Sequence, residues 1–263
     1  MKAIARRFLW VAAYAIAMAL LEAVVVAYLR ALIQVTEDAV ALGPYLAIET
    51  WREVGTLVML AAVGWLAGHK ATDRLAYGAF AFGLWDIAYY AWLKVLLGWP
   101  ASLLDWDILF LLPLRWWGPV LAPVLIALLV CAGALLAVVR AGQGRPPAIT
   151  QARVGALAAG GLLALYVFMA DSLHALLGGR SDWATLRPTS FPWPLFLIAL
   201  ALMAGSGLAM AWPYPHRASP PSPVMDDAWK QQDFTPAQPR PRSGGGETTE
   251  VGCTGGLCPP HPQ

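Results

Sequence analysis

The chain has 263 residues, of which 59% are hydrophobic and only 13% are charged, and its mean hydropathy is +0.57. Soluble domains are about half apolar and about a quarter charged, so this composition indicates a membrane protein surrounded by the lipid bilayer. The net charge of +2 is too small, and the basic residues too scattered, for a protein that binds nucleic acid, and three cysteines are too few for a disulfide scaffold.

The N-terminal segment shares features with a secretory signal peptide. Three basic residues precede an apolar run, and AMA at residues 17–19 resembles a cleavage site. The apolar run continues to Leu29, which is longer than the hydrophobic region of a signal peptide usually is. We therefore expect a retained first transmembrane helix.

Six segments are apolar enough to cross a membrane, which takes about 20 residues. They comprise residues 8–29, 53–68, 75–97, 120–139, 154–177 and 194–212. The second is short unless it begins near Ile48. The sequence thus predicts an all-α fold, a polytopic bundle of about six transmembrane helices in residues 1–213.

Residues 102–120 (SLLDWDILFLLPLRWWGPV) are apolar but contain two aspartates, a proline and an arginine. We interpret them as an interfacial or re-entrant segment after the third helix. With six spans, the basic clusters at the N-terminus, at residues 70–74 and at residues 140–153 all lie on one side, which the positive-inside rule makes cytoplasmic. A seventh span here would export the last cluster. We therefore predict that both termini are cytoplasmic.

Residues 214–263 are rich in Pro, Gly and Ser and poor in apolar residues, which predicts a disordered cytoplasmic tail. Cys253 and Cys258 lie in this tail near His261. Two thiols and one histidine leave a metal ion under-ligated, so we expect them to be inert and reduced.

The predicted threading places nearly every ionisable group of the helices in the half of the membrane away from the termini. Glu49, Arg52 and Glu53 share one helical face, and a second face carries Asp86 and Tyr90 four residues apart. A charge at the bilayer centre costs at least about 2.5–3.5 kcal/mol, so such faces should meet each other or a wet cavity. We predict an outward-opening polar pocket with residues 102–120 as its lid. Its candidate residues are Glu22, Glu49, Arg52, Glu53, Asp86, Tyr90, Lys94, Asp107, Asp171 and His174.

Other interpretations of these residues stay open. The charges could pair only to hold the bundle together. A metal site is not predicted, because no His-x-x-x-His or Glu-x-x-His pair occurs and His174 is the only histidine within a span. Nucleophilic catalysis is poorly supported, since Ser172 and His174 are two residues apart and do not face each other. A proton relay through carboxylates, tyrosines and histidine is better supplied.

Two further patterns concern packing. Six tryptophans gather near the end of the third helix and in the following loop, which favours an aromatic belt at the membrane interface, or else an aromatic wall along a lipid chain. Glycines in the fifth and sixth helices indicate close helix packing. The tryptophans are Trp85, Trp92, Trp99, Trp106, Trp116 and Trp117, and the glycines are Gly155, Gly160, Gly161, Gly205 and Gly207.

One part of the chain has a recognisable pattern. The segments EAVVVAYLR, ETWREVGTLVMLAAVGWLAG and WDIAYYAWLKVLLGWPASLLDWDILFLLPLRWWGPVLAPV lie within residues 22–123. They resemble a family of uncharacterised bacterial multi-pass inner-membrane proteins with the pattern WDxxYY … GWPxSLxxWDxLFLxP. The resemblance implies a bacterial inner-membrane location and no particular activity.

Two functions follow from these expectations. In the first, the pocket binds a small polar or amphiphilic ligand, with lipid- or quinone-directed chemistry or proton-coupled transport as variants. Transport would require polar residues in the inner half as well, and that half is dry. In the second, the protein is an accessory subunit of a larger membrane complex, and the polar faces are structural or interface pairs. The sequence identifies no cofactor and does not decide whether the protein is an enzyme.

Overall fold

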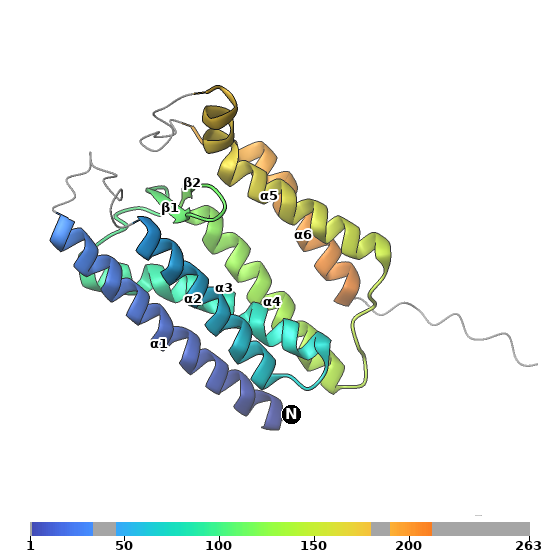
Figure 1. Cartoon of the computed structure of the whole chain (residues 1–263). Helices are drawn as coiled ribbons and strands as arrows, with labels where there is room; N and C mark the ends of the chain where they lie inside the picture. Colours follow the sequence, from blue (N-terminus) through green and yellow to red (C-terminus); the bar gives the residue numbers. More distant parts are fainter. Residues whose placement is uncertain (1, 34–45, 180–189, 212–263) are drawn as a thin grey trace, which may run out of the picture. The chain divides into compact units, whose positions relative to one another are not determined.

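The computed structural model describes residues 2–33, 46–179 and 190–211, which form six helices and one β-hairpin (Figure 1). The elements in chain order are α1 (Lys2–Ile33), α2 (Leu46–Ala67), α3 (Ala71–Leu97), β1 (Trp106–Phe110), β2 (Trp116–Pro119), α4 (Leu121–Gly142), α5 (Gln151–Leu177) and α6 (Trp193–Ala211). The predicted helical membrane bundle is confirmed. The predicted tail at residues 214–263, with Cys253 and Cys258, lies outside the described residues.

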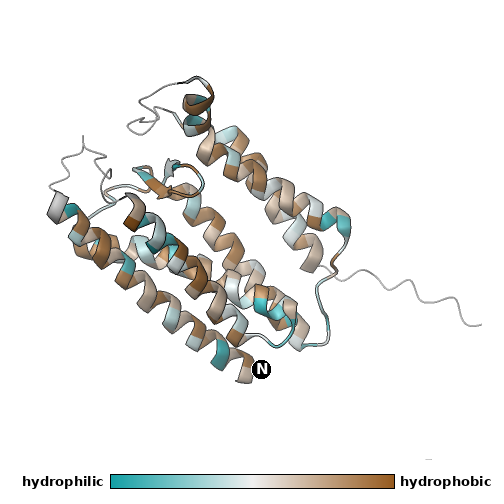
Figure 2. Ribbon diagram, in the orientation of Figure 1, coloured by the Kyte–Doolittle hydropathy of each residue, from teal (hydrophilic) through white to brown (hydrophobic). Residues whose placement is uncertain are grey.

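Five of these helices, α1 and α3 to α6, are long and apolar enough to cross a membrane. The remaining helix, α2, carries Glu49, Arg52 and Glu53 in its first two turns, and these charged residues lower its hydropathy. It begins at Leu46, well before residue 53 and close to the alternative start near Ile48. Figure 2 shows hydrophobic residues along the length of the helices and hydrophilic residues concentrated towards their ends. Large apolar side chains remain exposed on the helices, as expected of surfaces that face lipid.

The core that supports the site lies where α1 packs against α3. Phe8, Val11 and Ala15 of α1 pack in one cluster with Tyr77 and Ala81 of α3. These five residues lie in the half of the bundle nearer the N-terminus, and the same cluster continues along α3 to Trp85. Apolar packing therefore supports the helices from that half up to the site.

Glycine permits the closest helix contacts. A Cβ atom on Gly64 of α2 would lie 2.6 Å from the Cα atom of Gly78 in α3, so α2 and α3 approach with only hydrogen between their backbones. On α5, a Cβ on Gly160 would meet Met203 of α6 at 2.8 Å, which confirms the predicted close packing at that glycine. The other four glycines proposed for packing, Gly155, Gly161, Gly205 and Gly207, would meet nothing within 4 Å, so for them the prediction is wrong.

The segment after α3 forms an antiparallel hairpin, a local β-structure that we did not predict. Trp106 pairs with Pro119, Asp107 with Gly118 and Ile108 with Trp117. The segment contains no helix, which agrees with the expectation that it is not a seventh span. We call residues 106–119 the hairpin, and we call the end of the bundle that it occupies the hairpin end.

The connection from α3 to the hairpin is held by two charged side chains. The Nζ of Lys94 donates to the carbonyls of Gly98 at 3.1 Å and Pro100 at 2.7 Å, which satisfies acceptors at the end of α3. The carboxylate of Asp105 accepts from the backbone N–H of Ala101 at 2.7 Å and of Ser102 at 3.2 Å. The hairpin is therefore fixed where it leaves the helix.

Candidate functional site

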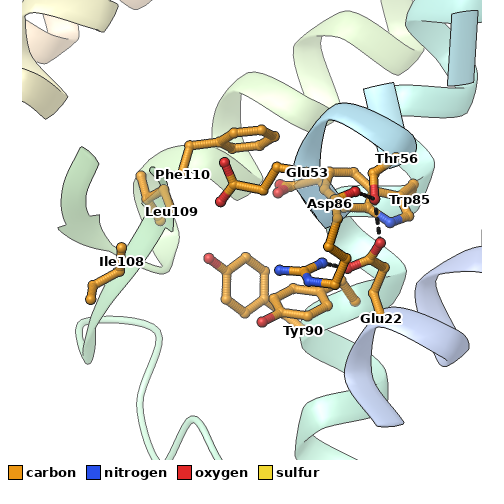
Figure 3. A pocket seen from close by; sticks show the side chains of 11 residues that line it. Glu22, Glu53, Thr56, Trp85, Asp86, Tyr90, Ile108, Leu109 and Phe110 are labelled. Atoms are coloured by element: carbon orange, nitrogen blue, oxygen red, sulfur yellow. Dashed lines mark hydrogen bonds and ion pairs between the residues drawn. The ribbon is translucent and has the colours of Figure 1, made fainter. Parts of the chain in front are cut away.

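A cavity lies between the hairpin and helices α1, α2 and α3 (Figure 3). It offers about 60 Å³ to the centres of water molecules and is partly open to the outside. One water needs about 10–15 Å³ by this measure, so the space holds about four waters or a small polar group. The lining residues are Glu22, Arg52, Glu53, Thr56, Trp85, Asp86, Tyr89, Tyr90, Ile108, Leu109 and Phe110.

One side of the cavity is a charged network that joins α1 to α2. The guanidinium of Arg52 forms an ion pair with the carboxylate of Glu22, and its Nε donates to Glu49 at 2.8 Å. The Thr56 hydroxyl, one turn further along α2, donates to Glu22. Glu22 and Glu49 are buried, so a nearby cation is needed to offset the loss of water around them. Arg52 supplies it for both carboxylates.

The roof of the cavity is the hairpin, which the helices hold at two points. Both carboxylate oxygens of Glu53 accept from the backbone N–H of Leu111, at 3.0 and 3.1 Å. The Tyr90 hydroxyl donates to Asp107 at 3.2 Å. One bond comes from α2 and one from α3, so both helices position the apolar side chains of β1 over the cavity.

Two polar atoms at the cavity have no partner among the described residues. They are the Nε1 of Trp85, a residue that is only 7% exposed, and the buried Oδ2 of Asp86. One is a hydrogen-bond donor, and the other is an acceptor when Asp86 is ionised. Buried polar groups are normally paired, so this cavity is suited to a polar occupant with both kinds of group.

Asp107 belongs to the hairpin and lies outside the membrane-spanning helices. Burial raises the pKa of its carboxyl to about 6, although the charge of Arg30 and the hydrogen bond from Tyr90 act in the opposite direction. This group therefore titrates near neutral pH, and its protonation changes the charge on the roof of the cavity.

The structure brings five of the predicted residues, Glu22, Arg52, Glu53, Asp86 and Tyr90, to the cavity lining. Two others are bonded to the lining: Glu49 through Arg52, and Asp107 through Tyr90.

Lys94, Asp171 and His174 do not line the cavity. Lys94 caps the turn after α3, as described above. Asp171 and His174 lie on α5, which packs against α6 and β2.

Sequence reasoning missed part of the lining. Thr56 lies four residues after Arg52 and three after Glu53, so helical spacing could have identified it. The apolar residues of β1 carried no such signal, because the hairpin itself was not predicted. For Trp85 and Trp117 the aromatic-belt interpretation is wrong, because their side chains are buried inside the protein rather than placed at its surface.

The chemistry available at the cavity is hydrogen bonding, charge pairing and proton exchange. Within residues 2–33, 46–179 and 190–211, no three His, Cys, Asp or Glu side chains lie close enough together to hold a metal ion. The polar groups instead comprise three carboxylates, one guanidinium, two phenols, one indole N–H and a threonine hydroxyl, facing the apolar side chains of β1.

No protein-family model, curated protein or solved structure matches the chain in the comparisons. The resemblance to bacterial inner-membrane proteins therefore stays a prediction.

Proposed function

We propose that this integral membrane protein binds a small polar or amphiphilic ligand in the cavity beneath the hairpin. The observation that carries the proposal is the pair of unpartnered atoms, Trp85 Nε1 and Asp86 Oδ2, at one cavity. Glu22 and Glu49 are paired with Arg52, and Glu53 is bonded to the hairpin backbone, so these are the two buried lining atoms left without a structural partner among the described residues. A bound group that accepts from one and donates to the other would satisfy both.

Binding is better supported than conduction. The lining residues lie between the middle of the helices and the hairpin, whereas Phe8, Ala15 and Tyr77 pack in an apolar cluster in the other half of α1 and α3. A transported polar substrate needs a polar path through both halves. The apolar residues of β1 suit an amphiphile whose polar group enters the cavity, so lipid- or quinone-directed chemistry remains within this proposal.

We also propose a bacterial inner-membrane location with both termini in the cytoplasm, which places the hairpin end on the outer side. The basic residues at the other end of the helices support this orientation. Reporter fusions after α4 and after α6 test it, and both reporters should be cytoplasmic.

The ligand proposal is tested by native mass spectrometry of the full chain purified in mild detergent. We expect a retained small molecule that is lost in Asp86→Ala and kept in the matched control Asp171→Ala, with both variants keeping the helical circular dichroism of the wild type. Wild-type protein free of any bound molecule, and unable to take one up from a membrane extract, would contradict the proposal.

The second candidate is an accessory subunit of a larger complex. The Glu22–Arg52–Glu49 network favours it, because a charged network that joins two helices can be purely structural. Under this alternative, the native mass would show a partner protein, and Asp86→Ala would change neither the partner nor any small molecule.

A further inference from the structure

The charges around the cavity do not balance. Glu22 is paired with Arg52, which leaves Glu53 and Asp86 as additional carboxylates. Among the residues that the structure describes, neither of these two takes part in an ion pair. Glu53 accepts from the backbone N–H groups of Leu111 and Leu112, and the Oδ2 of Asp86 accepts from nothing. A buried carboxylate without a cation is costly, so the cavity favours a positively charged occupant.

The aromatic side chains at the cavity also favour a positively charged occupant. Trp85 stacks with Tyr89 at a ring-centroid distance of 6.3 Å, and Tyr89 lies 5.2 Å from Tyr90. All three residues line the cavity beside the carboxylates. Aromatic faces attract cations within about 6 Å, and the attraction is stronger where water is excluded.

The volume of the cavity and its hydrogen-bonding groups limit which cation can bind there. The described residues offer no group of three metal-ligating side chains, which makes a bound metal ion a poor fit. The volume of about 60 Å³ accepts a group of a few heavy atoms, such as an aminoethyl group. The Oδ2 of Asp86 receives no hydrogen bond from the protein. A primary ammonium has three N–H groups that could donate one. A trimethylammonium has no N–H group and is larger, so it fits less well.

The other polar groups at the cavity suit a ligand that carries a negative charge next to its ammonium, that is, a zwitterion. The Trp85 indole needs an acceptor, and Arg52, with 26% of its side chain exposed, is the one cation among the lining residues. A phosphate ester next to the aminoethyl group would provide oxygens for both. Acyl chains would then meet the apolar side chains of β1 and the lipid.

We propose that the cavity recognises a phosphoethanolamine group, with its primary ammonium on Asp86 and Glu53 and its phosphate oxygens towards Arg52 and Trp85. This inference rests on the proposed function and specifies its ligand class. The same group occurs in an aminophospholipid and in a soluble phosphoethanolamine, and the cavity chemistry is shared by both sources.

The test is competition on the delipidated full-length protein in detergent, read by native mass spectrometry. Phosphatidylethanolamine, phosphatidylcholine and phosphatidylglycerol with identical acyl chains are offered in equal amounts, and soluble O-phosphoethanolamine is added in a second series. We expect the ethanolamine lipid to be preferred over the other two by about 10- to 100-fold in affinity. This ratio is what the loss of one charge-assisted hydrogen bond usually produces. Displacement of the lipid by the soluble compound would support the same recognition with a soluble source.

Variants locate the binding. Asp86→Asn should reduce the preference for the ethanolamine lipid to within about threefold of the choline lipid, while the control Asp171→Asn keeps it. If Asp86→Asn does not fold, Trp85→Phe keeps an aromatic ring, removes the indole N–H and should weaken lipid binding. Equal binding of ethanolamine and choline lipids by the wild type would overturn the inference without any variant.

The outcomes also separate this inference from the proposed function. A preference for phosphatidylglycerol that Asp86→Asn alters would refute the ammonium assignment and leave ligand binding in the cavity intact. Failure of all three lipids, of the soluble compound and of a whole membrane extract to bind would refute both.

Discussion

The ion pair between Arg52 of α2 and Glu22 of α1 provides a quantitative test of the network. Replacing Arg52 with leucine leaves the carboxylates of Glu22 and Glu49, whose side chains are 7% and 9% exposed, without their cation. Removing one partner of a buried pair costs about 3–5 kcal/mol. Arg52 keeps 26% of its side chain exposed, and solvent screening lowers the expected loss for Arg52→Leu to about 2–3 kcal/mol.

The same reasoning predicts strong coupling in a double-mutant cycle. Glu22→Leu removes the carboxylate that Arg52→Leu would strand, so the double variant should be about 1–2 kcal/mol more stable than the sum of the single effects predicts. The assay is reversible unfolding in detergent, followed by circular dichroism during titration with a denaturing detergent. A control cycle of Arg52→Leu with Asp171→Leu, which lies on α5, should be additive within about 0.5 kcal/mol. Additivity in the Glu22 cycle would refute the pairing.

Three further predictions concern packing, the hairpin and pH. Gly64→Ala should lower the free energy of unfolding by about 1–3 kcal/mol, because its Cβ would lie 2.6 Å from the backbone of α3. The control Gly55→Ala on the same helix meets nothing within 4 Å and should not destabilise the protein. Equal effects of the two variants in thermal unfolding would contradict the close contact. Glu53→Leu should speed hydrogen–deuterium exchange of the Leu111 amide, and Glu53→Gln, which keeps an acceptor, should do so less; an unchanged exchange rate in Glu53→Leu would show that the bond is absent. The pKa of Asp107 is raised to about 6, so the folded state holds this proton more tightly than the unfolded chain does, and the resulting stability is present at low pH and lost as pH rises through 6. The protein should resist unfolding about 1 kcal/mol better at pH 5 than at pH 7.5, and Asp107→Asn should reduce that difference; the same pH dependence in this variant would assign it to other groups.

Hydropathy was sufficient to predict the helices, because a membrane-crossing helix must be long and apolar whatever its neighbours are. It placed the start of the second helix too late, since Glu49 and Arg52 reduce the apolar signal where the helix begins. The hairpin escaped prediction for a different reason. All five residues of β1, WDILF, are partly buried, and only Asp107 among them is polar, so the strand lacks an alternating polar pattern.

The sequence predicts which site residues share a face of one helix, but it does not predict which helices bring their site residues together. Spacing along α2 and α3 correctly places Glu49 beside Arg52, and Asp86 and Tyr90 on one lining face. Spacing does not say which helices are neighbours. Asp171 was grouped with these residues by its predicted depth alone, and α5 instead packs against α6 and β2.

Ligand binding beneath the hairpin requires a water-accessible cavity inside an otherwise apolar bundle. Two buried positions give a matched test in a background without native cysteines: Thr56→Cys, at the cavity, and Ala81→Cys, in the apolar cluster between α1 and α3. The measurement is the rate of modification in intact membranes by the small cationic reagent 2-aminoethyl methanethiosulfonate. We expect rapid labelling at position 56 and none at position 81. Equal protection of both positions would contradict a water-accessible cavity at Thr56.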